Sequence, residues 1–418
     1  PRNLNNRTPP RRPGRNRKDR LAYSSRITVH FGSMVFERLI ALPSRGSCLL
    51  FGPRQTGKST LVRSLLPEAS WTVDLLRHDV FMRFAKEPGR FRAEVEAQLR
   101  AGVRTIFVDE VQKLPALLDE VHGLIEEKKA RFLLTGSSAR KLKRGGANLL
   151  AGRAATRHLH PLTVSEIGEA FDLERALRFG TLPAVVSGDD EAARDLLSAY
   201  AEVYLREEIQ DEGIVRNVGA FARFLDVAAA QSGEILNAAA VASDAGISAR
   251  TVRAYFEILE DTLVGFRLEA WRKSPRARLV GHPRFYFFDT GVTNALNRRL
   301  HAEPDPGTRG RLFEQWFVTE CARLVDYRFP ETRLFYWRTN HGAEVDLLFE
   351  RHGKLRLAVE IKSRPRISGA DLTGLRSFGE AHPRTPRIVV ATAPEPFRVE
   401  SIDVLPWRVF LERLDEWL

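Results

Sequence analysis

From about Ser47 the chain alternates short apolar runs with longer amphipathic segments. The apolar runs predict strands over residues 48–51, 71–75, 105–108, 131–135 and 156–159. The segments between them place apolar residues at helical spacing, as in 58–66, 91–100 and 116–128. Strands that alternate with helices predict a parallel sheet covered by helices on both faces.

The pattern changes twice further along the chain. Residues from about 163 to 270 are rich in Ala, Leu, Glu and Arg at helical spacing and carry almost no strand pattern. From about residue 310 it is mixed, with helices over 311–325 and 371–380, a hairpin over 333–350 and 354–362, and a strand over 387–392. We therefore predict a tail over 1–33, an α/β domain over 34–165, a helical lid over 166–225, a winged-helix domain over 226–300 and a second α/β domain over 305–418.

The composition narrows the class of protein. Of 418 residues, 43% are hydrophobic and 28% charged, as in ordinary soluble globular chains. No segment approaches the about 18 consecutive apolar residues of a membrane-spanning helix, and no hydrophobic signal segment lies near the start. Two isolated cysteines, Cys48 and Cys321, are typical of buried thiols in a reducing compartment. We expect a cytoplasmic protein without a membrane partner.

Most of the net charge of +12 lies in the tail. Residues 1–33 hold nine Arg or Lys residues against Asp19, which supplies +8 and leaves +4 for the rest. A basic tail attracts nucleic acid or anionic surfaces without specificity. We favour the alternative of a disordered leader without a role, in which case Met34 is a candidate start of translation.

A P-loop follows the first predicted strand. Residues 52–59 fit the pattern G-x-x-x-x-G-K-S/T at every defined position, between a buried strand and a helix. Such a loop turns successive backbone N–H groups and the helix N-terminus toward phosphates. We expect Lys58 to reach the β- and γ-phosphates of ATP and the Ser59 hydroxyl to ligate Mg²⁺. The predicted nucleotide-binding residues are Gly52, Pro53, Arg54, Gln55, Thr56, Gly57, Lys58, Ser59 and Thr60.

Two acids end the strand over 105–108. Asp109 is placed to hold Mg²⁺, and Glu110 to orient and polarise the water that attacks ATP. The strand over 131–135 ends in Thr135, Ser137 and Ser138, each a candidate to sense the γ-phosphate, although a plain turn explains them nearly as well. Arg153 is a candidate catalytic finger that completes a neighbouring copy's site in a homo-oligomer formed through the ATPase domain; the alternative is an arginine on a solvated loop.

Several motifs together resemble a family. VDEVQKLP (108–115), LLTGSSARKL (133–142), LAGR (150–153) and HPLTVSEI (160–167) are similar to a prokaryotic group of AAA+-type ATPases with an uncharacterised C-terminal domain. The resemblance continues through residues 180–183, 204–209 and 285–291, and so covers about 35–418. It implies ATP binding and hydrolysis but no particular biological role.

Residues 237–263 predict a helix-turn-helix. A helix over 238–244 and a turn over 245–247 lead to Ser248, which caps a second helix over 249–260. Arg250, Arg253 and Tyr255 would line that helix, and a strand-like wing follows with Arg267, Arg272, Lys273, Arg276 and Arg278. The region either contacts DNA or serves only as a packing module.

Three acids and a lysine stand out in the last domain. Glu360 and Lys362 share one strand face, a hairpin brings Asp346 beside them, and Glu314 lies on the preceding helix. This order resembles the PD-(D/E)xK nuclease superfamily, with Val345 in place of the proline. The resemblance implies a catalytic site of Glu314, Asp346, Glu360 and Lys362 in which Asp346 and Glu360 hold a metal. The alternative is a silent nuclease fold whose acids pair with arginines such as Arg338 and Arg364.

The predicted architecture is α/β: a P-loop parallel-sheet ATPase domain of AAA+ type, a helical and winged-helix middle, and a restriction-endonuclease-like C-terminal domain. The predicted function is ATP- and Mg²⁺-dependent action on DNA, either remodelling or regulated cleavage. Two alternatives stay open. One is a nucleotide-switched regulator with a silent nuclease fold, and the other is a signalling ATPase that acts on protein partners.

Overall fold

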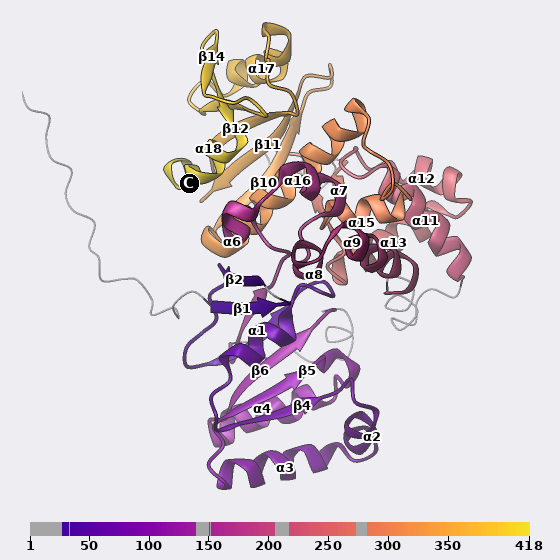
Figure 1. The fold of residues 1–418 in the computed structure, drawn as a ribbon, viewed down its shortest axis with the longest axis vertical. Coiled ribbons are helices and arrows are strands. Elements are labelled where there is room, and N and C mark those ends of the chain that lie inside the picture. Colours follow the sequence, from indigo (N-terminus) through magenta and orange to yellow (C-terminus); the bar gives the residue numbers. More distant parts are fainter. Residues whose placement is uncertain (1–26, 33, 139–149, 151, 205–216, 273–281) are drawn as a thin grey trace, which may run out of the picture.

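The computed structural model describes residues 27–32, 34–138, 150, 152–204, 217–272 and 282–418. Three parts follow one another along the chain. Figure 1 shows an α/β part at the bottom, a helical part at the right and a second α/β part at the top. The long helix α16 (Pro306–Arg328) lies between them and contacts all three. The predicted α/β class, with a helical middle, is confirmed.

The first part is built on a parallel sheet in the order β4-β5-β6-β3-β7. Strands β3 and β5 are buried along their whole length, as expected for a sheet covered on both faces. The strand that follows the acid pair in the chain, β6, lies between these two strands. The elements are β3 (Ser47–Phe51), α1 (Lys58–Leu65), β4 (Ser70–Asp74), α2 (His78–Lys86), α3 (Pro88–Arg100), β5 (Thr105–Asp109), η1 (Val111–Lys113), α4 (Leu117–Lys128), β6 (Arg131–Gly136) and β7 (Ala154–His158).

A hairpin precedes this sheet. Strand β1 (Ile27–Phe31) pairs antiparallel with β2 (Met34–Arg38), and Ile27 and Val29 pack in one cluster with Leu61 and Val62 of α1. The prediction of a disordered tail up to residue 33 is therefore wrong for β1, because its alternating apolar side chains pack against α1. Residues 1–26, with the basic side chains of the tail, lie outside the described residues.

The middle of the chain is one helical body. A single apolar cluster extends from Phe179 to Leu300, so the predicted lid and winged-helix domain share one core. The predicted boundary at residues 225 and 226 falls inside α11 (Val218–Ala230) and separates no domains. The other elements are α6 (Val164–Ile167), η2 (Gly168–Ala170), α7 (Leu173–Phe179), α8 (Pro183–Ser187), α9 (Asp190–Ala199), η3 (Tyr200–Tyr204), α12 (Ala238–Ala245), α13 (Ala249–Asp261), β8 (Gly265–Leu268), β9 (Arg284–Phe287) and α15 (Thr290–Leu296).

The helix-turn-helix is formed by α12 and α13. Gly246 ends α12 in the left-handed region, and the Ser248 hydroxyl accepts a hydrogen bond from the Thr251 N–H, as the sequence predicts for this cap. Strands β8 and β9 follow these helices in the chain and pair antiparallel with each other. Lys273, Arg276 and Arg278 lie outside the described residues, as do most of the motif at 204–209 and part of that at 133–142.

The last part is a mixed six-stranded sheet in the order β10-β11-β12-β13-β15-β14. Alternate side chains face opposite layers: Val359 and Ile361 pack in the cluster of α16, while Ala358 packs in the cluster of α17. The predicted hairpin (β10 to β12), helix (α17) and strand (β13) are confirmed. The sequence did not predict the strands and helices after β13. The elements are β10 (Thr332–Arg338), β11 (Glu344–Arg351), β12 (Lys354–Lys362), η4 (Gly369–Leu372), α17 (Thr373–Ala381), β13 (Arg387–Ala391), β14 (Phe397–Val399), β15 (Ile402–Pro406), α18 (Trp407–Glu412) and α19 (Leu414–Trp417).

Helix α16 is the long element of the fold, with 23 residues. It buries charged and polar side chains, among them Gln315, Glu320 and Arg323, as well as apolar ones. Neither α16 nor any other helix within the described ranges is both long and apolar enough to cross a membrane.

Close backbone packing between α7 and α15 gives a first prediction. A Cβ added at Gly291 would lie 2.0 Å from the carbonyl oxygen of Phe179, and backbone atoms cannot move aside cheaply. Gly291→Ala should therefore destabilise the protein by about 1–3 kcal/mol, as overpacking does. Urea unfolding followed by circular dichroism measures the loss.

The matched control is Gly89→Ala in α3, where an added Cβ meets nothing within 4 Å. Because alanine loses less backbone entropy than glycine in a helix, that variant should be unchanged or more stable by up to about 1 kcal/mol. Equal stability of the two variants would contradict the close packing of α7 on α15.

Candidate functional site

The P-loop lies between β3 and α1, as the sequence predicts. Lys58, the first residue of α1, is 5% exposed, and its Nζ donates hydrogen bonds to the carbonyl oxygens of Gly52 (2.8 Å) and Pro53 (2.9 Å). The lysine therefore crosses the inside of the loop and holds it closed on itself. A phosphate oxygen offers the same ammonium group a charged acceptor in place of two neutral carbonyls.

The N-terminus of α1 has the composition of an anion site. Its first intrahelical bond joins the Leu61 N–H to the Gly57 carbonyl at 2.8 Å, and the first turn has neither a side-chain cap nor an acid. The helix itself thus supplies no acceptor for the amides of its first turn. Gly57 has φ +88°, and a Cβ there would lie 2.3 Å from the ring of Phe31. Only glycine fits, and the residues present fit the phosphates of a nucleotide.

Asp109 lies directly across from the P-loop serine. The Ser59 hydroxyl donates to Asp109 Oδ1 at 2.7 Å, the Thr135 hydroxyl donates to the same oxygen, and Arg63 lies 3.3 Å from Oδ2. Burial raises the pKa of Asp109, and the hydrogen bonds from Thr135 and Ser59 partly oppose that rise. A hydroxyl and a carboxylate in contact at the end of a P-loop form an oxygen pair suited to Mg²⁺.

Glu110 stands at the tip of β5 in an unusual backbone conformation. Its φ of +58° is in the left-handed region, which is uncommon for a non-glycine residue. Its N–H donates to Thr135 Oγ1 at 3.1 Å. Gln112 donates from Nε2 both to the Glu110 carboxylate and, at 2.9 Å, to Ser137 Oγ. The carboxylate is thus held in one orientation by its own strand end and by the neighbouring strand.

Sequence reasoning missed Gln112 as a functional residue. It appears in the motif at 108–115, but a glutamine after an acid pair has no distinctive spacing of its own. The hydroxyls that follow β6 have separate positions: Thr135 contacts Asp109, and Ser137 contacts Gln112 and, at 3.4 Å, Glu110. Ser138 is buried beside them. Their proposed role in sensing the γ-phosphate stays a prediction.

Arg153 lies at the start of β7, away from the P-loop. Its side chain is about one-third exposed and forms an ion pair with Glu126 of α4 within the same chain. Its proposed action on a neighbouring copy stays a prediction.

The P-loop is joined to the rest of the chain by Arg38 of β2. This side chain is 1% exposed and donates to the carbonyl oxygens of Thr56 (3.2 Å) and His160 (2.7 Å) and to the Glu166 carboxylate (2.9 Å). Tyr327 of α16 lies 3.4 Å from the same guanidinium through its hydroxyl. One cation thus contacts the P-loop, the link after β7 and the C-terminal part.

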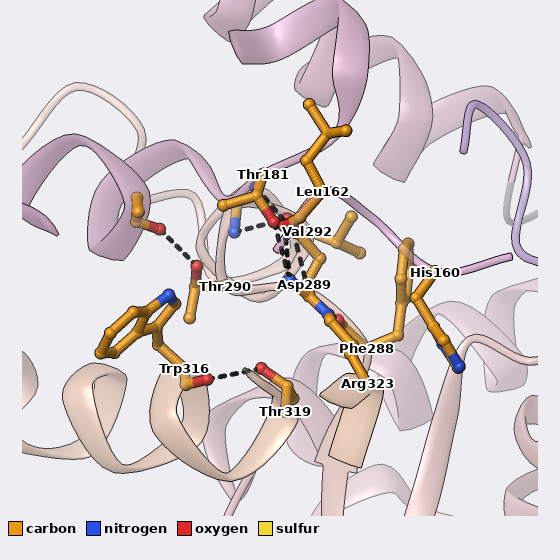
Figure 2. Close-up of polar contacts among 12 residues, drawn as sticks. His160, Leu162, Thr181, Phe288, Asp289, Thr290, Val292, Trp316, Thr319 and Arg323 are labelled. Carbon is orange, nitrogen blue, oxygen red and sulfur yellow. Dashed lines mark hydrogen bonds and ion pairs between the residues drawn. The ribbon is translucent and has the colours of Figure 1, made fainter. Parts of the chain in front are cut away.

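A second buried arginine closes the same boundary. Figure 2 shows Arg323 of α16 close to Asp289, Thr181 and Leu162, with Phe288 beside them. It donates to the carbonyl oxygens of Leu162 (3.1 Å) and Phe288 (2.8 Å) and to Thr181 Oγ1 (2.8 Å). A cavity of about 160 Å³ lies beside this group and reaches the first two residues of the P-loop; it is lined by Gly52, Pro53, His158, His160, Leu263, Gly265, Phe266, Phe288, Thr319, Ala322 and Arg323.

The C-terminal acids lie together, as the sequence predicts. Lys362 Nζ donates to Glu360 Oε1 at 2.7 Å, and Asp346 Oδ2 accepts from the Ile361 N–H at 2.8 Å. Glu314 of α16 reaches them through Arg284, a residue of β9 that sequence reasoning missed. Arg338 lies 3.8 Å from Glu344 and Arg364 pairs with Asp371, so neither of the two arginines suggested from the sequence pairs with the predicted acids.

The electrostatics of this cluster reflect burial. Burial, together with the nearby Asp346 charge, raises the pKa of Glu314 to about 7 and that of Glu360 to about 8. Among the described residues, no group of three or more His, Cys, Asp or Glu side chains is arranged to hold a metal ion. The arrangement therefore does not fit the metal that the nuclease resemblance implies, and cleavage of DNA stays a prediction that these positions do not favour.

The second helix of the helix-turn-helix presents two arginines. Arg250 and Arg253 are exposed on α13. Tyr255 is not available for a ligand, because it is 6% exposed and packs against the rings of Phe221 (4.9 Å between centroids) and Phe224 (5.2 Å). The prediction that Tyr255 lines a contact surface is wrong, since it lies on the apolar face of α13.

Comparison with known protein families gives three adjacent matches. Residues 44–168 match the family described as "AAA domain". Residues 170–303 match "Domain of unknown function (DUF8612)", and residues 309–410 match "Domain of unknown function (DUF4143)". The second match spans both the predicted lid and the predicted winged helix, in agreement with their common core.

Comparison with individual proteins gives relatives without an assigned role. Uncharacterised proteins of Mycobacterium tuberculosis and Mycobacterium bovis are each 29% identical over 334 residues, which cover 77% of this chain and 71% of the relative. An uncharacterised protein of Haemophilus influenzae is 20% identical over 269 residues, which cover 58% of this chain and 67% of the relative.

Two solved structures have low similarity. The Aeropyrum pernix ORC1 protein in complex with DNA has a TM-score of 0.27 at 15% identity, covering 60% of this chain and 86% of that chain. The S. cerevisiae Hsp104–ADP complex has a TM-score of 0.25 at 13% identity, and the match covers 68% of this chain and 43% of that chain. Scores this low support no inference. The chain thus combines a P-loop domain that matches the AAA family with two following regions that match families of unknown function.

Proposed function

We propose that this protein binds ATP with Mg²⁺ and hydrolyses it. The observation that carries the proposal is the contact between the P-loop and the tip of β5, where Ser59 bonds Asp109 and the next residue is the oriented carboxylate Glu110. The family match over residues 44–168 supports nucleotide binding independently of this geometry. When bound, Mg²⁺ would supply positive charge to the phosphates.

Each residue would have a separate task. Lys58 would exchange its two carbonyl acceptors for phosphate oxygens, and the amides at the start of α1 would bind phosphate by hydrogen bonds and the helix dipole. Ser59 and Asp109 would hold the metal. Glu110 would orient a water molecule for attack and accept its proton, because its carboxylate is fixed by Gln112 rather than paired with a cation among the described residues.

Contacts of Arg38 support a coupling between the nucleotide site and the rest of the chain. Arg38 contacts the Thr56 carbonyl inside the P-loop and Tyr327 of α16 in the C-terminal part. A change in P-loop position on binding ATP would therefore change the acceptors of a buried cation that α16 shares. We propose that the protein is a nucleotide-dependent switch between the ATPase part and the two parts that follow it.

We further propose that the switch acts on DNA through α13. The specific support is the pair of exposed arginines, Arg250 and Arg253, on the second helix of a helix-turn-helix that is followed in the chain by the β8–β9 pair. Arginines at the start of a recognition helix bind phosphates and guanine edges. A regulator that binds DNA without cleaving it accounts for the C-terminal acids better than a nuclease does, because Glu314 and Asp346 contact an arginine.

The first test separates binding from hydrolysis. Lys58→Ala should lose ATP affinity, because the loop loses the ammonium group that crosses it. Glu110→Gln should bind ATP but turn it over at least about 10²-fold more slowly, as expected for the loss of a general base. Titration with a fluorescent ATP analogue and a phosphate-release assay measure the two effects. Turnover by Glu110→Gln at the wild-type rate would refute the assignment.

Gln112 provides a finer test of how Glu110 is oriented. Gln112→Leu keeps the size of the side chain but removes the donor that links Glu110 to Ser137. We expect kcat to fall by about 10- to 100-fold, because a small misplacement of a catalytic group is costly, while KM for ATP stays the same. Gln112→Glu, which keeps the shape but repels Glu110, should behave alike. A rise in KM without a fall in kcat would show that Gln112 acts on binding instead.

The DNA proposal is tested by charge removal. The double variant Arg250→Ala and Arg253→Ala should bind duplex DNA more weakly and reduce the slope of log K against log salt concentration by about 2, one for each lost phosphate contact. The control is Arg333→Ala with Arg356→Ala, which removes two exposed arginines from the C-terminal hairpin. Equal DNA binding by the two double variants, measured by anisotropy at several salt concentrations, would exclude α13 as the contact.

A further inference from the structure

Arg284 lies in the middle of the C-terminal acid cluster although it belongs to the helical part. It comes from the first position of β9 and is 8% exposed. Its guanidinium lies 2.6 Å from Glu314 and 3.8 Å from Asp346, and it forms a further ion pair with Glu344. One side chain from the middle of the chain thus faces three carboxylates that come from two elements of the C-terminal part, α16 and β11.

The surroundings hold Arg284 in this position. Its Nη1 lies 3.3 Å from the Tyr286 hydroxyl, which itself donates to Glu314 at 2.9 Å. The ring of Tyr336 in β10 packs against the guanidinium, with 5.2 Å from its carbon to the ring centroid. These contacts fix the orientation of the guanidinium plane as well as its position. The hydroxyl, the aromatic ring and the carboxylates around Arg284 therefore match the shape and the charge of an arginine side chain.

The acids would repel one another without a cation. Glu314, Asp346 and Glu360 lie near one another, and within the described part of the chain Arg284 contacts Glu314 and Asp346. Lys362 contacts Glu360. Glu360 Oε2 is buried without a hydrogen-bond partner among the described residues, so it remains available as a ligand atom. Converging buried carboxylates need an opposite charge, and either a metal or a guanidinium can provide it.

We propose that Arg284 occupies the position of a divalent cation in this cluster, so that the protein carries its own cation there and a metal site appears only when Arg284 is removed. A guanidinium has five donors and no exchangeable ligand position, so it neutralises the acids but cannot hold a water molecule for attack. The same contact fixes β9 of the helical part to α16 and β11. The cluster is therefore an ionic joint between two parts of the chain.

The experiment compares Mn²⁺ binding by the full, nucleotide-free chain with and without this arginine. Thermal unfolding and electron paramagnetic resonance of Mn²⁺ are recorded for the wild type, Arg284→Ala, Arg284→Lys and Arg338→Ala. Arg338 is the matched control, since it also lies near Glu344 but is 45% exposed at the rim. We expect Arg284→Ala alone to gain a Mn²⁺ site, with a higher unfolding midpoint in Mn²⁺, because metal binding stabilises the native state by mass action.

A second substitution locates the metal. Asp346→Asn added to Arg284→Ala should abolish the gained site, whereas any weak Mn²⁺ binding near Ser59 and Asp109 should remain. Absence of a gained site in Arg284→Ala would overturn the proposal. So would Mn²⁺ binding by the wild type that Asp346→Asn removes, a measurement that stays decisive even if Arg284→Ala fails to fold. ATP turnover is measured separately, so these results do not depend on the proposed ATPase function.

Discussion

The buried guanidinium of Arg38 is the contact on which the arrangement of the whole chain depends. Taking a charge out of water is expensive unless every donor finds an acceptor, and Arg38 finds its acceptors on segments far apart in the sequence. The Glu166 carboxylate is 128 residues away and the Tyr327 hydroxyl is 289 residues away. Breaking such a buried pair by removing one partner typically costs about 3–5 kcal/mol. Arg38 therefore fixes the positions of the P-loop, the link after β7 and α16 relative to one another.

The same physical device recurs at the other boundaries of the chain. Arg323 binds the backbone carbonyls of Leu162 and Phe288, and Arg284 joins β9 to the acids of the last part. In each case the several N–H donors of one arginine bind oxygen atoms, carbonyl or carboxylate, that belong to different segments of the chain. Apolar clusters fill each part, and one of them continues from α7, β8 and β9 of the helical part into α16 and the last sheet. The buried arginines add directional contacts at these boundaries. Under the proposed switch, movement at the nucleotide site would reach α16 through Arg38.

The elements that the sequence predicts well are those with local causes. The P-loop, the acid pair on β5 and the Ser248 cap are each specified within about ten residues, and the structure has all of them. The position of Asp346 beside Glu360 follows from a hairpin, which is also local. Arg38, Arg284 and Gln112 could not be found in this way, because nothing in their neighbourhood distinguishes them from other polar residues. The boundary inside α11 was misplaced for a related reason, since a shared core is formed by contacts between distant segments.

The hairpin of β1 and β2 has a consequence for any shortened form of the protein. Its first strand covers apolar positions of α1, places Phe31 against the P-loop glycine, and occupies the backbone hydrogen bonds of one side of β2. A chain that starts at Met34 would leave that strand edge open together with the apolar surface beneath it. Open strand edges next to apolar surface pair with other molecules. Loss of the first strand would therefore favour self-association of the shortened chain.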